Sequence, residues 1–158
     1  MDLYIFLIMI SKLPDILNTV SIVQSYMKIK SQIVLVDDNP IFLEGITTFL
    51  SKSPDYEIVA TFSSGADLVE NINEYDPDLL LLDIEMPGLN GFETARKLSH
   101  LGNELKLIAI TMYNDRVYLN QLIDSGFRGF VSKNEITKQL LRVMDAVMKG
   151  ELAFPEMP

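Results

Sequence analysis

Several kinds of side chain are missing or scarce in this 158-residue sequence, and their scarcity narrows the chemistry. Cysteine is absent, which excludes disulfides, thiolate metal sites and a cysteine nucleophile together. The single histidine, His100, lies near the end of an expected helix and is interpreted as a surface residue, not as a phosphodonor. The lack of cysteine is compatible with a reducing cytoplasm, which is the localisation we expect.

Positive charge is also scarce. The chain has 13 Lys and Arg residues against 22 Asp and Glu residues, for a net charge of −9, and no basic run. Nucleic-acid binding draws much of its affinity from basic side chains that neutralise phosphates, and anionic membranes attract the same side chains. We therefore expect this segment to bind neither nucleic acid nor a membrane directly.

The hydrophobic run at residues 3–10 has eight residues, whereas a membrane-spanning helix needs about 20. Asp2 before the run does not suit a secretory signal, which begins with basic residues. Apolar residues then recur at helical spacing from Leu13 to Val23. We expect residues 1–27 to be a hydrophobic and amphipathic helical extension, either upstream of the true start of the gene or packed on the domain or a partner.

Strand and helix signals alternate strictly from residue 28 to residue 150. Short aliphatic segments typical of strands lie at 33–36, 56–62, 79–82, 105–110 and 129–132. Segments with a helical apolar face lie at 41–50, 66–72, 92–101, 117–123 and 136–147. This order predicts an α/β domain in which helices cover both faces of a parallel sheet. Residues 151–158, with two prolines, are expected to be a linker stub.

Polar side chains follow four of the five expected strands. Asp37 and Asp38 follow the first strand, Asp83 the third, Thr111 the fourth and Lys133 the fifth. Open parallel sheets bind ligands at the carboxyl ends of their strands, where the strand order reverses. If the order is 2-1-3-4-5, the first and third strands are neighbours at that reversal, and three carboxylates meet a hydroxyl and an ammonium group.

This set of groups has a specific chemistry. Crowded carboxylates repel one another, and Mg²⁺, which prefers oxygen ligands, relieves the repulsion. A metal ion also orients a phosphoryl group for attack by a carboxylate, which forms an acyl phosphate. Taken singly, each position is more often a turn former, a helix cap or a solvated side chain. Their coincidence at one end of successive strands favours a site.

The motifs V-D-D-N-P from Val36, L-L-L-L-D-I-E-M-P-G from Leu79, A-I-T-M-Y from Ala109 and G-F-V-S-K-N from Gly129 resemble the receiver domain of two-component response regulators. The resemblance covers residues 28–150. It implies the doubly wound, flavodoxin-like fold with five parallel strands in the order 2-1-3-4-5.

The resemblance also implies roles for the acidic residues. Asp83 would accept the phosphoryl group. Asp38 and Asp83 would bind Mg²⁺ through their carboxylates and Glu85 through its backbone carbonyl, while Asp37 would hold the metal through water.

On the opposite side of the site, Thr111 would be the switch hydroxyl and Lys133 the phosphate-binding lysine. Phe130 occupies the place of the family's rotating aromatic residue, and an ordinary core position is an equally good reading. Two positions depart from the commonest pattern. Asn134 stands where many receivers have proline, which excludes a cis X-Pro bond there, and Met112 stands where a smaller residue is frequent. We expect the bulk of Met112 to alter phosphorylation kinetics without loss of function.

The implied function is a signalling switch, not an enzyme, although the domain assists its own Mg²⁺-dependent phosphorylation and dephosphorylation. The implied phosphodonor is a sensor histidine kinase, and a homodimer is left open. Phosphorylation would change the face formed by the fourth helix, fifth strand and fifth helix. The segments LIAITMY and MKGELAFP resemble the subfamily with a C-terminal helix-turn-helix domain. That domain would regulate transcription and lies outside this segment.

Two alternatives remain open at this point. A haloacid-dehalogenase-like phosphohydrolase also uses an Asp nucleophile, and Asp83 and Glu85 have the required spacing. It would leave Asp37 and Asp38 unexplained, and turnover of an aryl phosphate would identify it. The other alternative is an interaction module that is no longer phosphorylated, which would not bind a metal ion.

Overall fold

The computed structural model describes residues 30–100, 105–112 and 117–154. The extension expected at residues 1–27 lies outside the described residues, as do residues 155–158 of the expected linker stub, and the side chain of His100 is not described either. Among the described residues, no helix has both the length and the apolar character required to cross a membrane.

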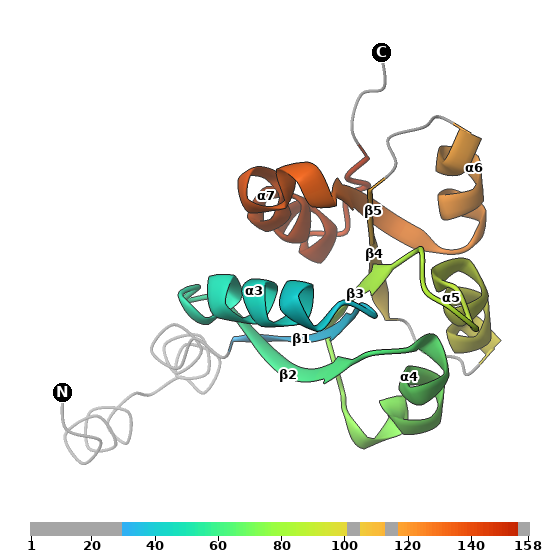
Figure 1. Cartoon of the computed structure of the whole chain (residues 1–158). Coiled ribbons are helices and arrows are strands. Elements are labelled where there is room, and N and C mark those ends of the chain that lie inside the picture. Colours follow the sequence, from blue (N-terminus) through green and yellow to red (C-terminus); the bar gives the residue numbers. More distant parts are fainter. Residues whose placement is uncertain (1–29, 101–104, 113–116, 155–158) are drawn as a thin grey trace, which may run out of the picture. The chain divides into compact units, whose positions relative to one another are not determined.

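Five parallel strands form one sheet in the order β2-β1-β3-β4-β5 (Figure 1). The strands are β1 (Ser31–Val36), β2 (Tyr56–Phe62), β3 (Leu79–Asp83), β4 (Lys106–Thr111) and β5 (Phe127–Ser132). All four neighbouring pairs are parallel. The predicted fold class and strand order are confirmed.

The described residues also form five α-helices and two short 3₁₀ helices, of which η2 and α7 follow the last strand. They are α3 (Pro40–Ser51), α4 (Gly65–Asn71), η1 (Ile72–Glu74), α5 (Gly91–His100), α6 (Val117–Asp124), η2 (Lys133–Glu135) and α7 (Ile136–Met148). Helices α3 and α7 cover one face of the sheet, and α4, α5 and α6 cover the other (Figure 1).

The central strands carry continuous aliphatic runs because both of their faces are buried. In β3, Leu80 and Leu82 belong to the core on the α4–α5–α6 face, and Leu79 and Leu81 belong to the core on the α3–α7 face. All four leucines are fully buried. The aspartate that follows them is thereby fixed at the carboxyl edge of the sheet.

Helix α3 begins directly after the acidic pair. The side chain of Asn39 is its N-cap and accepts hydrogen bonds from the backbone N–H groups of Ile41 (3.0 Å) and Phe42 (3.3 Å). Pro40 occupies the first helical position, where its missing N–H costs nothing. This start allows only a short, tightly turned loop between β1 and α3.

Ala153, which was expected to belong to a linker stub, forms an isolated bridge with the edge strand β5. Ala153 donates its backbone N–H to the carbonyl of Arg128 (2.8 Å) and accepts from the backbone N–H of Phe130 (3.1 Å). The pairing is parallel. The chain after α7 therefore touches the edge of the sheet at Ala153.

Candidate functional site

The carboxylates of Asp37, Asp38 and Asp83 converge at the carboxyl edge of the sheet. One oxygen from each lies within 4.8 Å of the others. Strands β1 and β3 pair in register up to Val36 and Leu82, so the next residue of each strand emerges at the same level. Asp37 and Asp83 are buried, whereas Asp38 is exposed.

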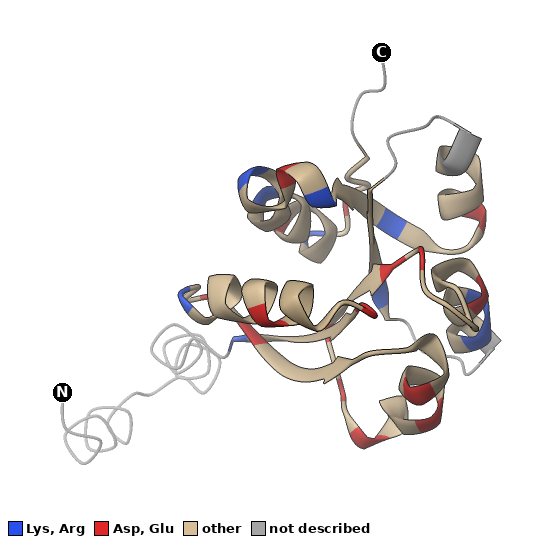
Figure 2. Ribbon diagram, in the orientation of Figure 1, with Lys and Arg blue, Asp and Glu red and all other residues tan. Residues whose placement is uncertain are grey.

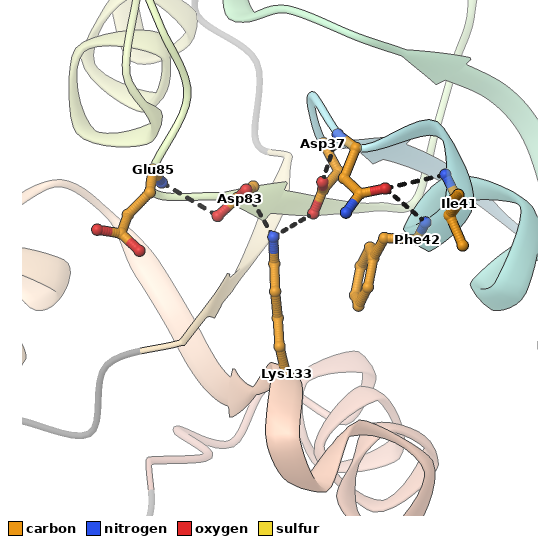
Figure 3. Close-up of polar contacts among 7 residues, drawn as sticks. Asp37, Ile41, Phe42, Asp83, Glu85 and Lys133 are labelled. Carbon is orange, nitrogen blue, oxygen red and sulfur yellow. Dashed lines mark hydrogen bonds and ion pairs between the residues drawn. The ribbon is translucent and has the colours of Figure 1, made fainter.

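The two buried carboxylates are anchored in the same way (Figure 3). Asp37 Oδ1 accepts a hydrogen bond from the backbone N–H of Asn39 (2.9 Å), and Asp83 Oδ1 accepts one from the backbone N–H of Glu85 (3.0 Å). In each case the donor lies two residues further along the chain, in a turn that follows a strand. One oxygen of each carboxylate is thus held by the backbone, and the other, Oδ2, remains for a cation.

Lys133 supplies that cation in this structure. Its Nζ lies 2.7 Å from Asp37 Oδ2 and 2.7 Å from Asp83 Oδ2, and it donates a hydrogen bond to the latter. The contact with Asp37 Oδ2 is an ion pair without hydrogen-bond geometry, which leaves this buried oxygen without a donor. A single ammonium group therefore faces two buried carboxylates.

The electrostatics of the site reflect this imbalance. Burial raises the pKa of Asp83 from 3.8 to about 6, and the charge of Asp37 adds to the rise, while the hydrogen bonds from Lys133 and Glu85 oppose it. For Lys133, burial lowers the pKa, but its close contacts with the negatively charged Asp37 and Asp83 outweigh burial and raise the pKa overall. The lysine therefore stays positively charged, and the site disfavours the ionised form of Asp83 relative to water.

The remaining predicted residues lie at the same edge or directly behind it. Thr111 is buried at the end of β4, where it pairs in register with Ser132, the residue before Lys133. Glu85 is exposed, and its backbone contacts Asp83. Phe130 is buried in the core on the α4–α5–α6 face, which agrees with its reading as a core residue.

Two residues of the site have no counterpart among the sequence-based predictions. The ring of Phe42 lies beside Lys133, with Nζ 4.8 Å from the ring centroid. Gly91, the first residue of α5, approaches the backbone behind Asp83 so closely that a Cβ atom there would lie 2.4 Å from the Asp83 carbonyl oxygen. Neither residue belongs to the motifs from which the site was predicted.

The other charged residues that the structure describes form no second cluster of buried carboxylates around a lysine. Figure 2 shows the basic residues of the described chain scattered over separate helices and strands. Among the described residues, the group of Asp37, Asp38 and Asp83 is the one acidic cluster with metal-binding spacing. The fold and the site together define an open parallel α/β domain with a carboxylate-lined cation site and a lysine at its switch point.

The chain belongs to the response regulator receiver domain family, whose model matches residues 33–145. The transcriptional regulatory protein DegU of Brevibacillus brevis is 32% identical over 121 residues, which are 77% of this chain and 51% of DegU. The chain thus spans about half the length of this curated relative.

Solved structures agree with this assignment. The isolated receiver domain of RcsB from Salmonella enterica serovar Typhimurium in its apo form has a TM-score of 0.75 and 26% identity, covering 81% of this chain and 95% of that one. A structure of two RcsB dimers bound to two parallel DNAs has a TM-score of 0.74 and 26% identity, covering 82% of this chain and 66% of that one.

Proposed function

We propose that Asp83 accepts a phosphoryl group and that the domain acts as a phosphorylation-dependent switch. The observation that carries this proposal is the arrangement of Asp83 beside Asp37 and Lys133, with one oxygen of each carboxylate fixed by the backbone and the other turned to the ammonium group. The Asp83 oxygen that faces Lys133, Oδ2, is the nucleophile, and it is oriented before any phosphodonor binds.

The residues present fit Mg²⁺. Three carboxylates converge with oxygen atoms within 4.8 Å of one another, and Asp37 Oδ2 is buried without a hydrogen-bond donor. Oxygen ligands with room for water are the set that Mg²⁺ prefers. Asp38 and Asp83 would hold the ion through their carboxylates, Glu85 through its backbone carbonyl and Asp37 through water. When bound, the ion would neutralise charge on the phosphoryl oxygens.

The other side chains act on the transferred group. Asp83 Oδ2 attacks phosphorus, and the bond between phosphorus and the donor's leaving group breaks as the acyl phosphate forms. Lys133, which contacts the Asp83 carboxylate, would bind an oxygen of the phosphoryl group once it is attached. Thr111 donates its hydroxyl to a second oxygen, and this contact together with that of Lys133 favours one of two states of β4 and β5. Phe130 of β5 changes its packing with that shift.

The partners follow from the family. In the cytoplasm, a sensor histidine kinase would supply the phosphoryl group to this domain. The face of α6, β5 and α7 would carry the change to a second copy or an output domain. DegU is a transcriptional regulator and RcsB binds DNA as a dimer, which supports a transcriptional output through a domain outside this chain. The domain assists its own phosphorylation and dephosphorylation and turns over no separate substrate.

Intact-mass measurement after incubation with a small acyl phosphate and Mg²⁺ tests the proposal. We expect one added phosphoryl group on the wild-type chain and none on Asp83→Asn or in excess EDTA. Asp124→Asn, which removes an exposed carboxylate of α6, should be phosphorylated like the wild type. Undiminished addition to Asp83→Asn would refute the assignment. Sustained hydrolysis of an aryl phosphate would favour a phosphohydrolase instead.

A further inference from the structure

The ammonium group of Lys133 has a third neighbour besides its two carboxylates. Nζ lies 4.8 Å from the centroid of the Phe42 ring, and Figure 3 shows this ring beside the end of the lysine side chain. A cation within about 6 Å of a ring centroid is attracted by the negative face of the ring. Unlike the carboxylates, the ring offers no lone pair to a metal ion.

The backbone of Phe42 is held by the same turn that holds Asp37. The backbone N–H of Phe42 donates to Asn39 Oδ1 (3.3 Å), and the backbone N–H of Asn39 donates to Asp37 Oδ1 (2.9 Å). The half-buried side chain also packs against the core on the α3–α7 face. Two hydrogen bonds of this turn and the packing of the ring against the core thus hold Phe42 beside Asp37.

We propose that Phe42 is a positioning residue that keeps the Lys133 ammonium at the edge of the site when the carboxylate oxygens turn to another cation. This inference rests on the proposed function of Asp83. The oxygens of Asp37 and Asp83 contact Lys133 in this structure, and they cannot serve the lysine and a metal ion equally. The contact with the ring involves no ligand atom, so it persists and holds the ammonium within reach of the incoming phosphoryl group.

Three replacements of Phe42 separate the charge contact from simple packing. Phe42→Leu removes the ring, Phe42→Tyr keeps it, and a trifluorinated phenylalanine keeps its shape while weakening its negative face. The measured quantity is the rate of Asp83 phosphorylation by a small acyl phosphate with saturating Mg²⁺. We expect Phe42→Leu and the fluorinated variant to be slower by about 3- to 10-fold and Phe42→Tyr to stay within about 2-fold of the wild type.

A double-mutant cycle tests whether the effect acts through Lys133. In a Lys133→Met background, Phe42→Leu should change the remaining rate by less than about 2-fold, since coupling requires both partners. Phe49→Leu removes another half-buried ring of α3 and is the control for general loosening of the helix. An equal loss with and without Lys133, or a Phe42→Leu variant as fast as the wild type, would overturn the proposal.

Nuclear magnetic resonance gives a readout that needs neither phosphorylation nor a variant of Phe42. The ε-methylene protons of Lys133, assigned by their loss in Lys133→Met, should show an upfield ring-current shift both without metal and with saturating Mg²⁺. Loss of the shift on addition of Mg²⁺ would refute the positioning role. If the wild-type protein were not phosphorylated, the function proposed for Asp83 would fail, and this measurement alone would still decide whether the ring holds the ammonium.

Discussion

Replacement of Asp83 by Asn should stabilise the metal-free domain at neutral pH. Burial is the main cause that raises the pKa of this carboxyl from 3.8 to about 6, so the folded state binds the proton more tightly than the unfolded state. Stability therefore falls as pH rises through this interval, and the full cost is present above it. A rise of this size corresponds to about 3 kcal/mol. Because Lys133 keeps only one carboxylate partner in the variant, we expect a net gain of about 1–3 kcal/mol.

Urea unfolding followed by circular dichroism in EDTA measures this gain. The difference between Asp83→Asn and the wild type should be largest above about pH 7. It should disappear only well below the ordinary pKa of 3.8, where both the folded and the unfolded wild type are protonated at this site. Saturating Mg²⁺ should stabilise the wild type more than the variant, which lacks a metal ligand. Asp124→Asn is the control for removing an exposed carboxylate. A variant that is less stable than the wild type in EDTA, or a difference independent of pH, would refute the reasoning.

Three further predictions concern other contacts of the domain. Lys133→Met should tighten Mg²⁺ binding, measured by titration calorimetry, because the lysine competes for the carboxylate oxygens; weaker binding would contradict this. Gly91→Ala should lower the free energy of unfolding by about 1–3 kcal/mol, measured in urea, because its Cβ meets the Asp83 carbonyl. Burial and the hydrogen bond to Asp145 raise the pKa of Tyr56 well above its ordinary value of 10.0. Wild-type stability should therefore fall above about pH 10 more steeply than that of Tyr56→Phe, and parallel urea-midpoint curves would contradict this.

The sheet could be predicted because its central strands obey a strong rule. A strand buried on both faces needs an unbroken aliphatic run, and the four leucines of β3 are such a run. The sequence pattern of the edge strand β5 was weaker. This strand begins at Phe127, two residues before the predicted start. Arg128 interrupts the apolar pattern there, which an edge strand tolerates because the side chain stays exposed.

The pairing of Ala153 with β5 and the contact of Phe42 with Lys133 were not predictable for a different reason. Both join segments that are distant in sequence. Ala153 pairs through backbone groups, which are the same in every residue and therefore leave no signal in the sequence. The contact of Phe42 with Lys133 depends on the conformation of one lysine side chain. By contrast, the meeting of Asp37 with Asp83 follows from strand order alone, since adjacent parallel strands end at the same edge.

The anchoring of the carboxylates explains why repulsion persists at this edge of the sheet. Two like charges that were free to move would separate until water screened them. Here the backbone N–H groups of Asn39 and Glu85 hold one oxygen of each carboxylate, so neither side chain can withdraw without losing a hydrogen bond. The repulsion is therefore built into the turns after β1 and β3, and only added positive charge relieves it. A phosphoryl group at Asp83 would increase the negative charge at the point where Lys133 is the only cation in contact among the described residues. The same fixed geometry that costs stability in the resting domain would thus make the contacts of this lysine depend on the phosphorylation state proposed for Asp83.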